Sequence, residues 1–399
     1  MAYDDALSSV GDDYWTSNYN KLARGVYVVV KRADNHWSRP FSGYAYDTGY
    51  TPYFSVDPTV TYIVDMYSMS RINGNDIVVK KCSIRACDAS EAEMGADTSG
   101  FSWHIYHAAE RKFEFSSTYY INSGYSDVTS NIIASATYSI YRHKGYQTGK
   151  DYLVLHNNGI YIYGWGNEHS TLLKQVHIKS DYGHQRKYIL AHEMGHAFVF
   201  QANNETSLGA YTGYNATGTM CEWSSSGSHS IASKEKQSGA LNEGWAHFFA
   251  ASTWNNMSES DCKFKYYKND IDHDADGTPI DKPTIDCEYP DFQGSYPIIH
   301  RQWLNNYCSH DDETYANEWD WLMTFWDLVS EYSYVDYMDV VNMLVGVSGK
   351  FSSNETDLYC RLRISASTIS PTFDDRFNTK AAYNGVNYYD SNESNCSAY

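Results

Sequence analysis

Residues 192–196 read His192-Glu193-Met194-Gly195-His196, which matches the HExxH pattern. On a helix, residues four positions apart share one face, so both histidines can bind one Zn²⁺. Glu193 lies one step round the helix, close enough to take a proton from a zinc-activated water without binding the metal itself. The segment therefore predicts a zinc site with Glu193 as the general base. The alternative is an ordinary solvated helix that carries these side chains without chemistry.

A third ligand is expected downstream. The extended pattern HExxHxxGxxH is not met, because Val199 and Gln201–Asn203 stand where its Gly and His would fall. The apolar segment Leu241–Phe249 (LNEGWAHFF) carries Glu243, and a buried carboxylate is costly unless it is paired or metal-bound. We therefore predict Glu243 as the third zinc ligand. Glu222 is a nearer rival, but it adjoins a cysteine and a Ser-rich run that are typical of a loop.

The LNEGWA segment resembles the LNEG-aromatic-Ala segment of the aminopeptidase-N family, and with HExxH the chain resembles the gluzincin metallopeptidases. By this resemblance Glu243 completes the zinc site. His247, four residues on, takes the place of an Asp that orients a ligating His in thermolysin-like enzymes. We predict that His247 supports a zinc ligand in the same way. A packed core histidine is the alternative.

Two departures from these families affect the predicted activity. Forty-six residues lie between His196 and Glu243, more than in either family, and no GxMEN element precedes the motif. GxMEN binds the free amine of the substrate in the aminopeptidase-N family, so its absence favours an endopeptidase. The segment 218–222 also resembles the GTxxD element of the aspzincins, with Glu222 in the place of Asp.

A second metal site is predicted in the DxDxDG pattern of residues 272–277. Oxygen ligands at alternate positions can converge on one Ca²⁺, and the glycine permits the sharp turn. An EF-hand needs a glutamate at the twelfth position, where Pro283 stands, so a shorter loop that ends at Asp281 is the closer match. An acidic loop without a metal is the alternative. The predicted calcium ligands are Asp272, Asp274, Asp276 and Asp281.

The elements that must position these residues divide into strands first and helices later. Alternating apolar residues between turn signals predict the strands Gly25–Lys31, Thr61–Met69 and Asp76–Cys82, the last after the turn at residues 73–76. Helical spacing predicts helices at Asp127–His143, Gln185–Phe200, Ser233–Ala251, Glu318–Glu331 and Val335–Val345. We therefore expect an α+β protein in two domains. An N-terminal antiparallel β-sandwich spans residues 1–115, and a zincin-like, mainly helical catalytic domain spans residues 116–399.

Composition narrows the class of protein. The 399 residues carry a net charge of −19 and no Lys/Arg-rich run, which argues against nucleic acid or an anionic membrane as a partner. No apolar run is long enough to span a membrane. Residues 1–20 lack the features of a signal peptide, so we expect a mature chain. The eight cysteines contain no CxxC pair and predict disulfides, with Cys82–Cys87 and Cys262–Cys287 as the expected local pairs.

Together these features predict a secreted or cell-surface zinc metalloendopeptidase that hydrolyses protein or peptide substrates. Zinc is the expected cofactor, and calcium the second. Two alternatives stay open. One is a calcium-stabilised adhesin or binding protein with a degenerate HExxH, and the other is a zinc hydrolase that acts on something other than a peptide.

Overall fold

The computed structural model of this chain describes residues 2–3, 24–57, 59–82, 102–105, 120–121, 128–143, 152–157, 168–170, 175–179, 187–203, 234–254, 263–264, 285–286, 302, 315–347, 358–386 and 396. The chain divides into two compact units, residues 1–193 with 271–279 and residues 194–270 with 280–399. Their border falls within helix α3 (Lys187–Ala202), so residues 194–202 of α3 belong to the same unit as α4 (Gln237–Trp254). The domain border predicted at residues 115–116 lies outside the described residues.

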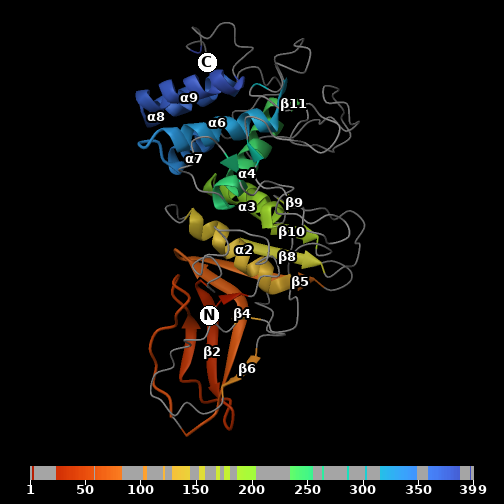
Figure 1. Cartoon of the computed structure of the whole chain (residues 1–399), viewed down its shortest axis with the longest axis vertical. Coiled ribbons are helices and arrows are strands. Elements are labelled where there is room, and N and C mark those ends of the chain that lie inside the picture. Colours follow the sequence, from red (N-terminus) through yellow and green to blue (C-terminus); the bar gives the residue numbers. More distant parts are fainter. Residues whose placement is uncertain are drawn as a thin grey trace. The chain divides into compact units, whose positions relative to one another are not determined.

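The first unit contains a mixed sheet of eight described strands (Figure 1). Seven follow the order β3-β2-β4-β5-β8-β10-β9, and β6 pairs with β4. The β5–β8 and β8–β10 pairs are parallel, and the remaining pairs are antiparallel. The strands are β2 (Val26–Arg32), β3 (Phe41–Tyr44), β4 (Tyr62–Ile72), β5 (Asn75–Cys82), β6 (Ser102–Ile105), β8 (Tyr152–Asn157), β9 (Glu168–Ser170) and β10 (Gln175–Lys179).

The three strands predicted from alternation are confirmed as β2, β4 and β5, and the turn between β4 and β5 has a local cause. Asn73 and Gly74 both have positive φ, at 51° and 87°. A two-residue type I′ hairpin turn requires positive φ at both central residues, and the Asn-Gly pair adopts it at low cost. The sequence therefore fixes this hairpin through two residues.

The separate antiparallel sandwich predicted for residues 1–115 is replaced by one sheet that extends beyond that region. β5 pairs in parallel with β8, from Ile77 opposite Tyr152 to Cys82 opposite Asn157. Helix α2 (Val128–Arg142) lies between these strands in the sequence and packs on β4 and β5. Alternation and turn residues indicate where strands begin and end. They carry no information about which distant strand becomes a parallel neighbour.

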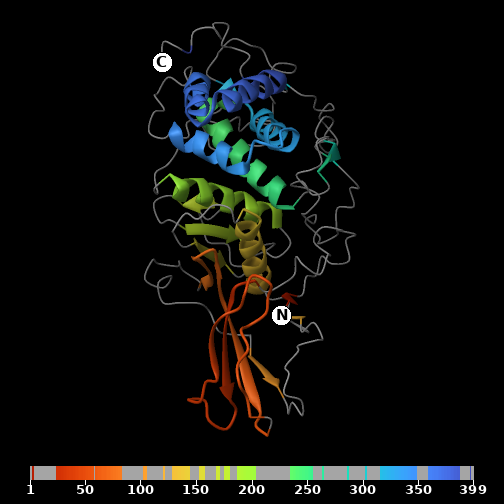
Figure 2. The same cartoon turned by 90° about the vertical axis from the view of Figure 1, so that its left-hand side faces the viewer.

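The second unit is mainly helical, so the α+β class is confirmed (Figure 2). The helices predicted at 233–251, 318–331 and 335–345 correspond to α4, α6 and α7, whereas α8 and α9 were not predicted. Beyond α4, the described helices are α6 (Glu318–Glu331), α7 (Tyr337–Gly346), α8 (Leu358–Ile369) and α9 (Pro371–Asn384). Short strand pairs are β11 (Glu235–Lys236) with β14 (Tyr315–Ala316), β12 (Lys263–Phe264) with β13 (Ile285–Asp286) and, in the first unit, β1 (Ala2–Tyr3) with β7 (Tyr120–Ile121).

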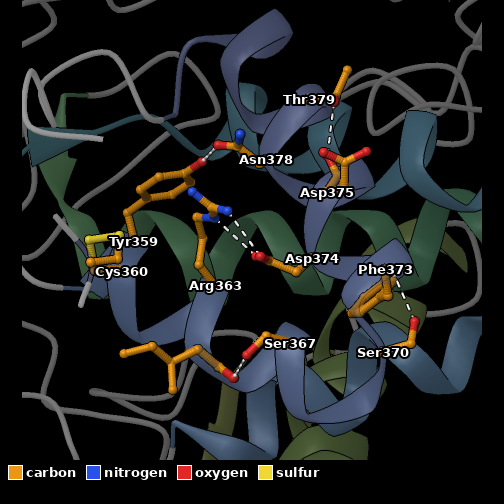
Figure 3. Close-up of polar contacts among 12 residues, drawn as sticks. Tyr359, Cys360, Arg363, Ser367, Ser370, Phe373, Asp374, Asp375, Asn378 and Thr379 are labelled. Carbon is orange, nitrogen blue, oxygen red and sulfur yellow. Dashed lines mark hydrogen bonds and ion pairs between the residues drawn. A yellow bond between two sulfur atoms is a disulfide. The ribbon is translucent and has the colours of Figure 1, made fainter. Parts of the chain in front are cut away.

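Helices α8 and α9 pack together as a hairpin, and Figure 3 shows the polar contacts within and between them. Arg363 makes a bidentate pair with Asp374, with both N–O distances at 2.9 Å. Ser370 caps α9 by accepting a hydrogen bond from Phe373 N at 3.0 Å, and Gly385 ends that helix at a φ of 83°. A disulfide joins Cys360 to Cys396, a pair that the sequence did not suggest.

Candidate metal centre

Helix α3 carries the HExxH motif in a fully buried setting. Its described side chains from 190 to 200 are all buried, including His192, Glu193 and His196. A helix that is buried all round must satisfy its polar side chains within the protein. The two histidines lie one turn apart on the same face. The helix and the spacing predicted from the sequence are thus confirmed.

Helix α4 brings Glu243 to these histidines. Glu243 Oε2 lies 3.3 Å from His196 Nε2, and one ligand atom from each of His192, His196 and Glu243 lies within 4.8 Å of the others. Zinc ligands at 2.0–2.1 Å and tetrahedral angles lie about 3.4 Å apart, so the His196–Glu243 separation suits two ligands of one metal ion. Within the described part of the chain, this is the one such group of His, Cys, Asp or Glu residues. The donor set of two imidazoles and one carboxylate suits a divalent cation such as zinc.

A glycine explains how α3 and α4 come so close. A Cβ atom on Gly195 would lie 2.8 Å from Phe249 Cβ and 3.1 Å from Ala246 Cα, so a side chain does not fit there. Trp245 Nε1 also donates a hydrogen bond to the Gly195 carbonyl oxygen at 3.0 Å, which ties the two helices together. Gly195 therefore has a packing role: it lets the helix with His192 and His196 approach the helix with Glu243.

His196 is oriented by the residue that precedes Glu243. The Asn242 side-chain nitrogen Nδ2 lies 3.2 Å from His196 Nδ1, and both groups are buried. In this orientation the amide donates to Nδ1. A 180° turn of the amide would bring its oxygen to Nδ1, where it would accept the ring proton and leave the Nε2 lone pair for a metal ion. One turn of α4 thus supplies the carboxylate that faces His196 Nε2 and the amide that contacts its other nitrogen.

His247 lies one turn after Glu243, and the structure places it against helix α6. Its Nε2 is 2.9 Å from Glu318 Oε2, and both side chains are almost fully inaccessible to solvent. Its predicted role in supporting a zinc ligand stays a prediction. Reasoning from the sequence missed Glu318, whose only signal is an acidic residue in the first turn of a predicted helix, a common helix-start feature.

Several predicted residues lie outside the described part of the chain. They include the rival ligand Glu222 and the cysteines 87, 262 and 287 of the predicted disulfides. The predicted calcium ligands also lie there and stay predictions: Asp272, Asp274, Asp276 and Asp281.

Comparisons with protein-family models, curated proteins and solved structures gave no match to this chain. Interpretation of the centre therefore depends on its own residues and geometry. None of the described helices combines the length and apolar character needed to cross a membrane.

Proposed function

We propose that this chain is a zinc-dependent metallopeptidase of gluzincin type with a zincin-like catalytic domain. The observation that carries the proposal is the convergence of His192, His196 and Glu243 in a buried group on two helices. Structural zinc sites are closed by four protein ligands, whereas catalytic sites use three and leave one position for water or substrate. Three protein ligands, one of them a carboxylate, match the catalytic pattern.

Glu193 is the residue that would move protons. It is buried on α3 directly after His192, in a setting where a carboxylate has few water molecules to solvate it. Zinc in such a site polarises a peptide carbonyl and lowers the pKa of a water molecule. The Glu193 carboxylate takes the proton from the attacking water and later donates it to the leaving amine. This assignment follows from its position in the HExxH motif.

An extracellular endopeptidase is the form of the proposal that best suits the rest of the chain. The Cys360–Cys396 disulfide favours an oxidising compartment. The LNEGWA segment supports the gluzincin assignment, and the absence of a GxMEN element before the motif favours internal cleavage of protein substrates over removal of single N-terminal residues.

The proposal is tested by measuring zinc content and cleavage of a denatured protein such as casein. Wild-type protein should hold one zinc ion per chain and cleave casein. Glu193→Gln keeps the size and hydrogen-bonding capacity of the side chain but removes the base. That variant should retain zinc and lose about 100-fold or more in cleavage rate. Near-wild-type cleavage by Glu193→Gln would contradict the role of Glu193, and wild-type protein without zinc would contradict the proposed class.

A further inference from the structure

The turn of α4 that carries Glu243 packs directly against the first turn of α6. A Cβ atom on Gly244 would lie 2.4 Å from Trp321 Cβ and 2.8 Å from the Glu318 carbonyl oxygen. Only glycine allows so close an approach, so the backbone of α6 lies directly against the residue that follows the metal ligand.

The Glu318 side chain makes a second contact with the same part of α4. Its Oε2 lies 2.9 Å from His247 Nε2, one turn beyond Glu243. Glu318 therefore contacts α4 through its backbone at Gly244 and through its carboxylate at His247. These two contacts lie on either side of one helical turn.

The end of α6 that provides these contacts is itself fixed. Asn317 caps the helix by accepting a hydrogen bond from Trp319 N at 2.9 Å. Immediately before it, Ala316 of β14 pairs with Glu235 of β11, and β11 leads directly into α4. Helices α4 and α6 are thus joined by the β11–β14 pair just before each helix begins. They are joined again by the contacts of Glu318 with Gly244 and His247.

Burying a carboxylate costs desolvation free energy, so it is an unfavourable way to join two helices when joining them is its only role. Glu318 is 0% exposed and His247 is 1% exposed. Well-packed apolar residues often hold such a contact equally well, because desolvation offsets much of what a buried ion pair gains. A hydrogen bond differs in being directional, so it restricts how one helix can turn or slide against the other. Glu243 has to meet His196 at 3.3 Å, which makes that directionality useful.

We propose that Glu318 is a positioning residue of the metal centre, which holds the metal-binding turn of α4 in place through His247 and Gly244. Groups that orient metal ligands typically contribute 10- to 100-fold to metal affinity. The inference rests on the proposed metal centre and adds to it a residue from a third helix, α6.

The test compares two equally buried acids on the same helix. Asp327 is also 0% exposed on α6, and its Oδ2 accepts a hydrogen bond from Asn384 of α9 at 3.0 Å. Glu318→Ala and Asp327→Ala both remove a buried carboxylate from α6, so both should lower the melting temperature. Zinc affinity is measured for each full-length variant by competition with a chromophoric chelator. The absorption spectrum of bound Co²⁺ reports the ligand geometry.

We expect zinc affinity to fall about 10- to 100-fold in Glu318→Ala, with a changed Co²⁺ spectrum. In Asp327→Ala it should stay within about threefold of wild type. Glu318→Gln can still hydrogen-bond to His247 and should restore most of the affinity. Equal affinities in wild type and Glu318→Ala, or equal losses in the two alanine variants, would overturn the positioning role.

Glu318→Asp keeps the charge but shortens the side chain, and it serves if the alanine variant does not fold. Its zinc affinity should lie clearly below that of wild type, and a wild-type value would overturn the inference. The outcome for wild-type protein separates the two proposals. If wild-type protein binds no zinc, the proposed function fails. If it binds zinc tightly and Glu318 variants do the same, only the positioning role fails.

Discussion

Two helix pairs in the second unit pack by different means. In α4 all 18 residues are buried, among them the polar Asn242, Glu243 and His247. Helices α8 and α9 instead alternate buried and exposed positions. The Arg363–Asp374 pair that joins α8 to α9 retains about a fifth of its side-chain surface in water. The pair that joins α4 to α6, His247–Glu318, retains almost none.

The difference distinguishes interactions that stabilise the fold from interactions that position the candidate metal centre. Amphipathic helices with partly solvated ion pairs and conventional caps suffice to build a helical hairpin, as α8 and α9 show. The buried polar side chains Asn242, Glu243 and His247 of α4 each have to be desolvated and then satisfied within the protein, which costs free energy. Glycines at two helix contacts, Gly195 and Gly244, bring those polar groups together. Buried polar groups that cost free energy to desolvate are expected at a functional site.

Loss of Glu243 should have the largest effect on the α3–α4 pair. Zinc present at about 1,000 times its dissociation constant stabilises a protein by about 4 kcal/mol, because only the native state binds it. Glu243→Ala removes one of three ligands and should lose most of that stabilisation. The measurement is the rise in melting temperature on adding zinc, together with the zinc content after dialysis.

Glu222→Ala is the matched control for the choice of third ligand. It should retain zinc and its thermal stabilisation. The reverse pattern, with zinc lost from Glu222→Ala and kept by Glu243→Ala, would assign the third ligand to Glu222 and remove the chain from the gluzincins.

A methyl group at Gly195 should have the next largest effect. Its Cβ would lie 2.8 Å from Phe249 Cβ, and overpacking of this kind costs about 1–3 kcal/mol. The better helix propensity of alanine returns about 1 kcal/mol, so the net loss for Gly195→Ala should be up to about 2 kcal/mol. Because α3 and α4 must move apart, zinc affinity should fall as well. Denaturant unfolding without zinc and a zinc titration measure the two effects separately.

Gly346→Ala provides the comparison at another helix contact. There a Cβ would lie 2.0 Å from the Ser365 hydroxyl oxygen, between α7 and α8 and on neither metal-binding helix. This variant should lose stability and keep wild-type zinc affinity. If both glycine variants lose zinc affinity equally, close packing at Gly195 has no special connection to the ligands.

The three residues of the candidate metal centre were predictable because each is marked by local sequence. His192 and His196 share a helical face at a spacing of four, and Glu243 stands out as an acidic residue in an apolar helix. Both inferences require only that a helix forms. The N-terminal strands and the Asn73-Gly74 turn were predictable for the same reason, since alternation and turn chemistry are properties of neighbouring residues.

The features that could not be predicted from the sequence depend on contacts between residues far apart in the chain. The hydrogen bond between His247 and Glu318 joins residues 71 positions apart, and neither residue type predicts the other as its partner. The parallel pairing of β5 with β8 likewise joins residues 75 apart, such as Ile77 and Tyr152. Gly195 and Gly244 look like ordinary small residues until the neighbouring helix is in place. Helix α8, which carries Arg361 and Arg363 among its apolar residues, was not predicted.

The smallest expected effect belongs to the α8–α9 hairpin. Arg363→Ala removes both hydrogen bonds to Asp374, and because the pair is partly solvated the loss of stability should be about 1 kcal/mol or less. Arg363→Lys keeps the charge but cannot make the bidentate contact, so it should lose part of that amount. Zinc affinity should be unchanged in both variants, because the pair joins helices that carry no ligand. A drop in zinc affinity comparable to that of Gly195→Ala would mean that the two helix pairs are coupled, and the distinction between a pair that serves folding and a pair that serves the site would then be lost.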